Sequence, residues 1–447
     1  MNFVSSSVVT NQLPSQHGPR KTSLRQVATW GLPLAAALAV LAHFSPLAAG
    51  AVYLLLFVSI ALWQPRIALM IAFALVPIVQ VLPLHLPVHL DVSDFSMAVL
   101  FPICMLKTAQ MGKPVRMGPS LWPTLIYLLF CALSTIPHLS TTGLSAYGQM
   151  LVYLIFAVMI CASFPGGPED LLFAFKGAVG MLAVFAFLYL VTHNHAPNEN
   201  KNLWGAVLGS GFAICLELWF AAVLSNRRKE AKWLIIALVL IGVALLLSVS
   251  RGGWMEATIG SLVILAFRRR YRLIFRVALV LAPIIIILWL ALPRQQQKYA
   301  TAIGTNNVDV QARLKIIQFS WNMFKAHPFA GVGVQLRKEI DQTDIFTITL
   351  AETGVQGLLA FLAIHVVVFW TAWKLRRRVA QTDPRFSLIV LGAALILCRF
   401  VHGMVDIYWA RGPQLWAWGA VGMLAAVYFE TGRGTNRPLP PSDRKRL

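Results

Sequence analysis

Residues 233–249 read WLIIALVLIGVALLLSV, a run without a charged side chain. A transmembrane helix needs about 20 predominantly apolar residues, within a range of about 17 to 25. The bilayer core holds no water for unpaired backbone groups, so only helices and closed barrels cross it. Because this run lacks the polar–apolar alternation of a barrel strand, it predicts a membrane-spanning helix.

Similar runs recur along the chain, which has 447 residues, of which 58% are hydrophobic and 12% charged. This composition excludes a soluble globular protein. The sequence predicts an all-α polytopic membrane protein with about 12 to 14 transmembrane helices, because the first, second and fourth runs are short or interrupted. The runs cover residues 28–46, 48–64, 67–86, 93–107, 121–137, 147–164, 171–192, 203–225, 232–249, 252–267, 273–292, 345–373, 386–405 and 413–430.

Basic side chains are concentrated in the short loops between these runs. The formal net charge of +21 would suggest a nucleic-acid partner in a soluble protein. Lys and Arg in short loops instead mark the cytoplasmic side of a membrane protein. With a cytoplasmic N-terminus, the inner loops hold Lys107, Lys113, Arg116, Arg227, Arg228, Lys229, Lys232, Arg268, Arg269, Arg270, Arg272, Arg276, Lys374, Arg376, Arg377, Arg378 and Arg385. The turn at residues 165–170 is acidic and is the exception; we expect no nucleic-acid partner.

This orientation predicts a multi-pass protein of the bacterial inner (cytoplasmic) membrane with both termini in the cytoplasm. The longest polar interval then faces the periplasm, and within it residues 310–324 have the apolar spacing of an amphipathic helix at the membrane surface. The predicted regions are a cytoplasmic tail (1–27), a transmembrane region (28–292), a large periplasmic loop (293–344), C-terminal transmembrane helices (345–430) and a basic cytoplasmic tail (431–447).

Arg251 lies between two apolar runs on the predicted outer side, within the sequence SVSRGGW at residues 248–254. An arginine there opposes the positive-inside bias, which indicates an anionic partner. Guanidinium binds phosphate through two parallel hydrogen bonds, and the two following glycines allow close backbone approach. The alternative is an arginine that caps helix carbonyls or reaches lipid head groups. Glu256, about one helical turn further on, is predicted to hold Arg251 in place.

Arg313 begins the amphipathic helix of the predicted loop, close to Lys315. A second cation at the same membrane surface would suit a diphosphate, which carries more charge than one arginine neutralises. The alternative is a solvated helix face that touches lipid phosphates. We predict a substrate-binding function for both side chains.

Further ionisable side chains lie in or near the last two apolar runs, where a charge is costly unless it is paired. Asp406 is predicted to form a structural ion pair with Arg399 or Arg411. His402 lies one turn from Arg399, and a substrate site at these residues is the alternative.

Three acidic residues occupy earlier apolar runs. Glu352 precedes Gly354 and Gly357, whose spacing permits close helix packing. Glu217 has no evident partner in the sequence, and Asp94, with Ser93 before it, is predicted to cap a helix N-terminus.

The sequence offers no convincing metal, disulfide or nucleotide site. His193 and His195 form a short pair, but no further ligand lies at a suitable spacing. The cysteines lie inside apolar runs, where a buried thiol is ordinary packing. No Walker-type glycine loop is present, which argues against ATP-driven transport.

Taken in order along the chain, these features resemble the O-antigen ligase and polymerase superfamily of bacterial membrane glycosyltransferases. The resemblance covers residues 198–361 and rests on Ser250-Arg251-Gly252, Arg313 in the outer loop, Pro328 to Gly333, and LAETGVQG at residues 350–357. It implies about 12 helices and a periplasmic loop over a cavity open to the outer leaflet. It also implies metal-independent transfer of a glycan from a polyprenyl diphosphate to lipid A-core or to a growing glycan. Arg251 and Arg313 match the family arginines that bind the diphosphate.

The chain departs from the family at the proposed base. A histidine is usual shortly before the glycine pair, whereas this sequence has Thr343 followed by Asp344. Threonine cannot accept the proton, but a carboxylate can. Asp344 or Asp341 is the predicted substitute, ahead of His327. A family member that has lost activity or uses a different geometry is the alternative.

The sequence therefore predicts a metal-independent membrane glycosyltransferase without a cofactor, which ligates or polymerises polyprenyl-diphosphate-linked glycans of O-antigen or exopolysaccharide at the periplasmic face. Its expected partners are the lipid-linked donor, a glycan or lipid A-core acceptor, and membrane lipids. The alternatives are a non-enzymatic scaffold for polysaccharide export and a solute transporter.

Overall fold

The computed structural model describes residues 24–78, 91–192, 201–270, 308–340, 344–406, 408–409 and 412–433, together with residues 272, 290 and 294. The chain divides into two units, Met1–Leu54 and Leu55–Leu447. The first unit contains α1 (Leu24–Phe44) and the beginning of α2 (Pro46–Trp63).

The second unit is a helical bundle, and no β-strand occurs in the residues that the structure describes. Its helices after α2 are α3 (Pro65–Ala74), α4 (Val92–Gln110), α5 (Leu121–Thr135), η1 (Ile136–His138), α6 (Thr141–Leu151), the π-helix η2 (Val152–Ala157), α7 (Val158–Ala162), α8 (Pro168–Val191), α9 (Lys201–Leu224), α10 (Arg228–Leu247), α11 (Arg251–Phe267), α14 (Val308–Ala326), α15 (Leu336–Glu339), α16 (Ile345–Leu375), α17 (Pro384–Gly403) and α18 (Pro413–Arg433).

Eight helical segments are long and apolar enough to cross a membrane, among the described residues. They are α4, α5 with η1, α6 through α7, α8, α9, α10, α16 and α17. The all-helical, multi-pass membrane protein predicted from the sequence is thereby confirmed. Residues 273–292 lie outside the described residues, so the total of about 12 to 14 helices stays a prediction.

The outward-facing side chains of the spanning helices are apolar. Exposed large hydrophobic residues include Trp122 and Leu129 on α5, Ile236 on α10, and Val366 and Trp370 on α16. In lipid these side chains face hydrocarbon at no cost. The helix most enclosed by protein is α17, with 83% of its apolar window buried, and it packs against α9, α11, α16 and α18.

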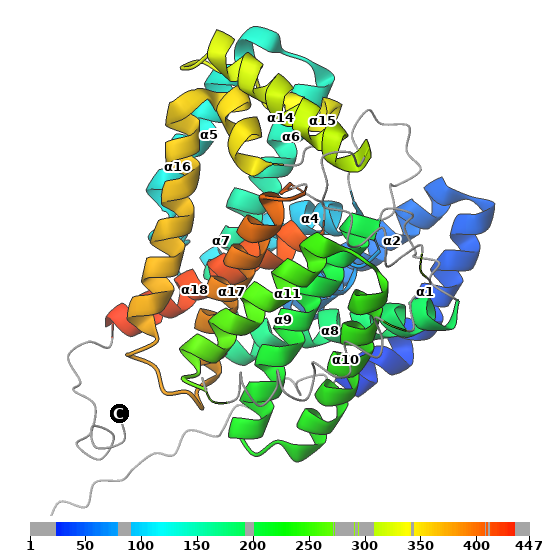
Figure 1. Cartoon of the computed structure of the whole chain (residues 1–447). Coiled ribbons are helices and arrows are strands. Elements are labelled where there is room, and N and C mark those ends of the chain that lie inside the picture. The colour runs from blue at the N-terminus through cyan, green and yellow to red at the C-terminus, as the bar shows by residue number, and fades with distance from the viewer. Residues whose placement is uncertain are drawn as a thin grey trace, which may run out of the picture. The chain divides into compact units, whose positions relative to one another are not determined.

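Residues 308–340 form one end of the second unit, which we call the α14 end. In Figure 1, α14 and α15 lie at the upper end of α16, and α14 runs at a large angle to α16. α14 packs on α16, and α15 packs on α6 and α16. The helix predicted at residues 310–324 is confirmed, as α14. Its exposed side chains include Leu314, Phe319 and Trp321.

A buried ion pair between α9 and α11 gives Glu217 the partner that the sequence did not reveal. Both Arg268 and Glu217 have fully buried side chains, and Nε of Arg268 donates to the carboxylate at 3.2 Å. The same guanidinium donates to the Gln381 carbonyl at 2.6 Å and to the Ser387 hydroxyl at 3.1 Å. Arg268 thus joins α9 and α11 to the start of α17, and is not the solvated loop cation that its position suggested.

The predicted helix cap at Ser93-Asp94 is wrong. α4 begins at Val92 with Asp91 in the N-cap position, so Asp94 lies inside the first turn. The Asp94 carboxylate accepts hydrogen bonds at 3.0 Å from the Gln149 amide and from the Tyr153 hydroxyl. Side-chain partners on α6 and η2, and not the backbone of its own helix, explain a buried carboxylate here.

Candidate functional site

The start of α11 carries Arg251 on a tightly defined turn. The Ser250 hydroxyl caps the helix by accepting the Gly253 N–H at 3.3 Å. The preceding Val249 has φ 53°, a left-handed conformation that β-branched residues rarely adopt. Such strain persists where the surroundings fix the backbone, and it is frequent at functional sites. Arg251 is the first helical residue and is half-buried.

The two glycines after Arg251 allow helices to approach closely. A Cβ atom on Gly252 would lie 2.9 Å from the His402 ring of α17. A Cβ atom on Gly253 would lie 2.5 Å from the Gly205 carbonyl oxygen of α9. The glycines of SVSRGGW therefore bring the peptide next to Arg251 into contact with α9 and α17.

Glu256 is the centre of a fully buried polar cluster. Its Oε1 lies 3.5 Å from Nη1 of Arg399, and its Oε2 lies 3.2 Å from Nδ1 of His402. The Ser210 hydroxyl donates to Oε1. These contacts bind Glu256 to α9 and α17, and a bond from Glu256 to Arg251 stays a prediction.

Arg313 joins α14 to the turn after α17. Its guanidinium donates to the Val405 carbonyl oxygen and lies 3.7 Å from the Asp406 carboxylate. The sequence paired Asp406 with Arg399 or Arg411, but the structure places it beside Arg313; Arg411 lies outside the described residues. Lys315 is exposed nearby on α14.

The turn at residues 402–406 contacts both Gly252, the residue after Arg251, and the side chain of Arg313. The Val405 and Asp406 N–H groups donate to the His402 carbonyl oxygen at 3.0 and 2.9 Å, so the turn is compact. The His402 ring contacts the residue after Arg251, and Val405 and Asp406 contact Arg313. Two segments that are 62 positions apart, 313 − 251, therefore meet the same turn.

α16 is interrupted at Gly354, which has φ 70° and ψ −173°. The loop after α14 docks on this break: the Val332 N–H donates to the Ala351 carbonyl at 2.9 Å, and the Val355 N–H donates to the Pro328 carbonyl at 3.0 Å. A Cβ atom on Gly354 would lie 2.5 Å from the Phe329 carbonyl oxygen. Gly354, the first glycine of the predicted helix-packing pair, thus interrupts α16 at the point where the loop after α14 binds to the helix backbone.

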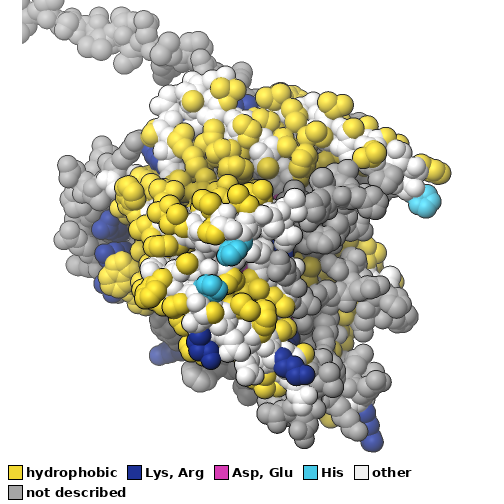
Figure 2. Space-filling view, turned by 90° about the horizontal axis from the view of Figure 1, so that it is seen from above, with side chains coloured by type: hydrophobic (Ala, Val, Ile, Leu, Met, Phe, Trp, Pro, Cys, Tyr) yellow, Lys and Arg dark blue, Asp and Glu magenta, His cyan; other side chains and the backbone are white. Residues whose placement is uncertain are grey.

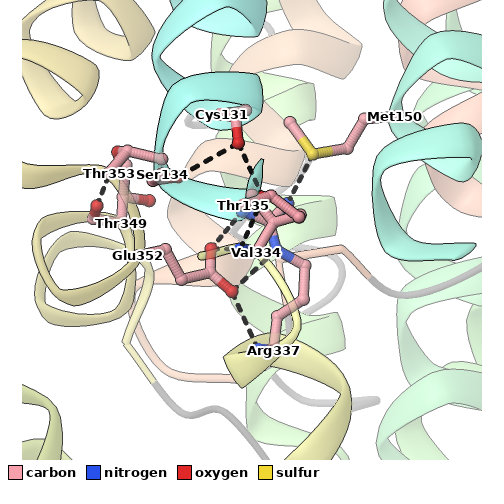
Figure 3. Close-up of polar contacts among 9 residues, drawn as sticks. All are labelled: Cys131, Ser134, Thr135, Met150, Val334, Arg337, Thr349, Glu352 and Thr353. Atoms are coloured by element: carbon pink, nitrogen blue, oxygen red, sulfur yellow. Dashed lines mark hydrogen bonds and ion pairs between the residues drawn. The ribbon is translucent and has the colours of Figure 1, made fainter. Parts of the chain in front are cut away.

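A buried ion pair between Arg337 and Glu352 fixes this loop to α16 (Figure 3). Nε of Arg337 donates to both carboxylate oxygens at 2.9 Å, and its backbone N–H donates to Oε1 at 2.8 Å. The guanidinium also lies over the Trp409 ring at 4.7 Å and contacts Met150 Sδ at 3.2 Å. Burial by itself would lower the pKa of Arg337, but the Glu352 carboxylate raises it above the ordinary value.

Asp344 has a structural function in the described chain. Its carboxylate caps α16 by accepting the Phe346 and Thr347 N–H groups at 3.3 and 3.0 Å. Asp341 and Thr343 lie outside the described residues. Either aspartate as a proton acceptor therefore stays a prediction.

No group of three or more His, Cys, Asp or Glu side chains is close enough to hold a metal ion in the described part of the chain. The predicted pair His193 and His195 lies outside it. His327 is exposed at the end of α14.

Residues 236–348 match the family model of the O-antigen ligases. This match supports the resemblance of the chain to the O-antigen ligase superfamily. The matched region contains Arg251, Glu256, Arg313 and Arg337, and it ends before the break in α16 and before α17. A comparison with curated proteins gives no match.

Sequence reasoning missed one part of this candidate site, Arg337, and gave less weight to another, His402. Arg337 stands beside Lys338 in a polar loop, and nothing in that pattern distinguishes it from a solvated cation. His402 was noted as a neighbour of Arg399, in a group of residues for which a substrate site was the alternative to a structural ion pair. The one available signal was its position near the end of an apolar run, where an ionisable residue needs a partner.

Proposed function

We propose that the protein is a glycosyltransferase that ligates or polymerises polyprenyl-diphosphate-linked glycans at the periplasmic face of the inner membrane. The observation that carries the proposal is that Gly252, the residue after Arg251, and the side chain of Arg313 both contact the turn at residues 402–406. Two guanidinium groups match the charge of a diphosphate and bind its oxygens in pairs.

The diphosphate is both handle and leaving group in this reaction. The acceptor hydroxyl attacks the anomeric carbon, the bond from that carbon to the diphosphate oxygen breaks, and the electron pair remains on the diphosphate. Cations fixed beside the departing oxygens stabilise the charge that develops there. Arg313 is one-third exposed, and its 3.7 Å separation from Asp406 leaves hydrogen-bonding capacity for phosphate.

The surface of the α14 end supports access from the lipid phase. Figure 2 looks down on the molecule from above, and hydrophobic side chains with a few scattered cations make up much of the described surface. Exposed Leu314 and Trp321 on α14 suit the boundary between head groups and acyl chains. A polyprenyl chain in the bilayer would place its diphosphate at this level.

The orientation is tested by cysteine labelling. The five native cysteines are all buried, so background labelling should be low. A Gln318→Cys variant, on an exposed face of α14, should react with a membrane-impermeant maleimide in cells with a permeabilised outer membrane and an intact inner membrane. Arg377→Cys, exposed at the end of α16, should react only after the inner membrane is opened. The reverse pattern would place the site in the cytoplasm and end the proposal.

Arg251→Ala tests the proposed chemistry. Purified protein given a polyprenyl-diphosphate glycan and an acceptor should release free polyprenyl diphosphate. The variant should insert normally, but its transfer rate should fall by at least about 10²-fold, because a fixed hydrogen-bond donor to the leaving group is lost. Arg377→Ala removes an exposed arginine just beyond the C-terminal end of α16 and should keep the wild-type rate. A fully active Arg251→Ala protein would show that the site is elsewhere.

The scaffold and the transporter give different results in the same assay. Either would leave the lipid-linked donor intact in the presence of acceptor. The family histidine is replaced by Thr343 in this chain, and this replacement favours the alternative of a non-enzymatic family member.

A further inference from the structure

Glycosyl transfer to a hydroxyl needs a group that accepts the hydroxyl proton as the new bond forms. Building on the proposed function, we propose that His402, which lies beside Glu256, accepts this proton. Sequence reasoning placed the proton acceptor at Asp341 or Asp344; the geometry points to α17 instead.

His402 lies between the attachment points of the two arginines. Its ring contacts Gly252, so no Cβ atom would fit between the imidazole and the peptide that follows Arg251. Its carbonyl oxygen accepts the N–H groups of Val405 and Asp406, the two residues that contact Arg313. A diphosphate held by both arginines would therefore bring the anomeric carbon next to this turn.

The imidazole lies beside a buried carboxylate. Nδ1 is 3.2 Å from Oε2 of Glu256, a distance that suits an ion pair once the ring is protonated, and neither atom has a hydrogen-bond partner among the described residues. We assign the other ring nitrogen, Nε2, to accept the proton from substrate. Glu256 is itself held by the Ser210 hydroxyl and by Arg399 at 3.5 Å. Arg399 donates to the Tyr408 carbonyl at 2.7 Å, which links the cluster to the chain beyond the turn.

Two other candidates in these helices already have partners. His365, buried on α16, has Nδ1 2.9 Å from the Phe361 carbonyl and Nε2 3.0 Å from the Tyr408 hydroxyl. Both ring nitrogens are therefore occupied. The two oxygens of Asp344 accept backbone N–H groups at the start of α16.

The proposed step balances without a further reactant. The acceptor oxygen bonds to the anomeric carbon, its proton passes to Nε2 of His402, and the bond to the diphosphate breaks with its electron pair leaving on the diphosphate. The imidazolium is then stabilised by the adjoining Glu256 carboxylate. It returns the proton to water when the polyprenyl diphosphate leaves.

The acceptor must displace part of the cover over His402, which is 1% exposed. The turn above it is tied to α14 by Arg313 through Val405 and Asp406. A bound diphosphate would offer Arg313 stronger acceptors than these, so donor binding would release the turn before the acceptor enters. Acid–base contacts of this kind are often completed only in the substrate complex.

His402→Gln separates a proton acceptor from a structural residue. We expect kcat to fall by about 10²-fold or more, while KM for the donor stays within about threefold. His365→Gln is the matched control and should keep the wild-type kcat and KM.

The outcomes distinguish this inference from the proposed function. Wild-type kcat in His402→Gln, alongside a strongly impaired Arg251→Ala, would overturn the inference and leave the proposed function standing. If the wild-type protein transfers no glycan, both the proposed function and this inference are wrong. Should His402→Gln fail to fold, the Glu256→Gln variant tests the same inference. A kcat that falls by at least about tenfold with an unchanged KM supports the inference, and an unchanged kcat overturns it.

Discussion

Arg337→Ala is expected to lower the free energy of unfolding by about 3–5 kcal/mol, because it leaves the Glu352 carboxylate buried without its counterion. The two side chains are 3% and 0% exposed, so water cannot replace the lost partner. The change should appear as a lower midpoint of thermal unfolding of the purified protein in detergent, compared with wild type at one scan rate.

Arg385→Ala is the matched control for this prediction. Arg385 pairs with Asp383 at the start of α17, but the two side chains are 37% and 23% exposed. A partly solvated pair contributes about 1 kcal/mol or less, so this variant should unfold close to the wild-type midpoint. Equal unfolding midpoints for Arg337→Ala and Arg385→Ala would contradict the large contribution to stability that we assign to the buried Arg337–Glu352 pair.

The Arg337–Glu352 pair explains how an interrupted helix survives at the α14 end. A break in a membrane helix exposes backbone groups that lipid cannot satisfy. Here the loop after α14 supplies the partners, through Val332 and Pro328. Arg337 then holds the same loop against α16. The Arg337–Glu352 ion pair and the break at Gly354 therefore form one structural unit. The docked loop connects this unit to α14, which carries Arg313.

The helices were predictable from the sequence because hydropathy records a local quantity, the cost of placing each segment in lipid. The runs at 232–249 and 345–373 correspond closely to α10 and α16. The amphipathic helix was likewise local, since its spacing is contained in α14. The break at Gly354 was not predictable in the same way, because a long apolar run has the same hydropathy whether or not a loop docks on it.

The site was predicted in part for the same reason. Arg251 and Arg313 can each be recognised from their local sequence. Arg251 opposes the positive-inside charge bias, and Arg313 lies at the start of the predicted amphipathic helix. Their common contact, the turn at residues 402–406, depends on how α11, α14 and α17 pack. Pairs such as Glu217 with Arg268, 51 positions apart, depend on the same packing and have no local signature.

Gly354→Ala is expected to detach the loop from α16 and to lower glycan transfer by about 10²-fold, because misplacing positioning groups by about 1 Å has effects of that size. The backbone at φ 70° and ψ −173° lies in a region that is essentially restricted to glycine and costs other residues about 1–3 kcal/mol. The added Cβ atom would also lie 2.5 Å from the Phe329 carbonyl oxygen, so the loop must move.

Hydrogen exchange at the Val332 and Val355 amides, which bridge loop and helix, reports the detachment directly. Both should exchange faster in Gly354→Ala, while amides of α17 keep their protection. Gly148→Ala is the matched control, because Gly148 lies within α6 and a Cβ atom there meets nothing within 4 Å. Since Ala is the better helix former, that variant should be neutral or slightly more stable. Unchanged exchange and transfer in Gly354→Ala would mean that the break in α16 is not needed to hold the loop in place.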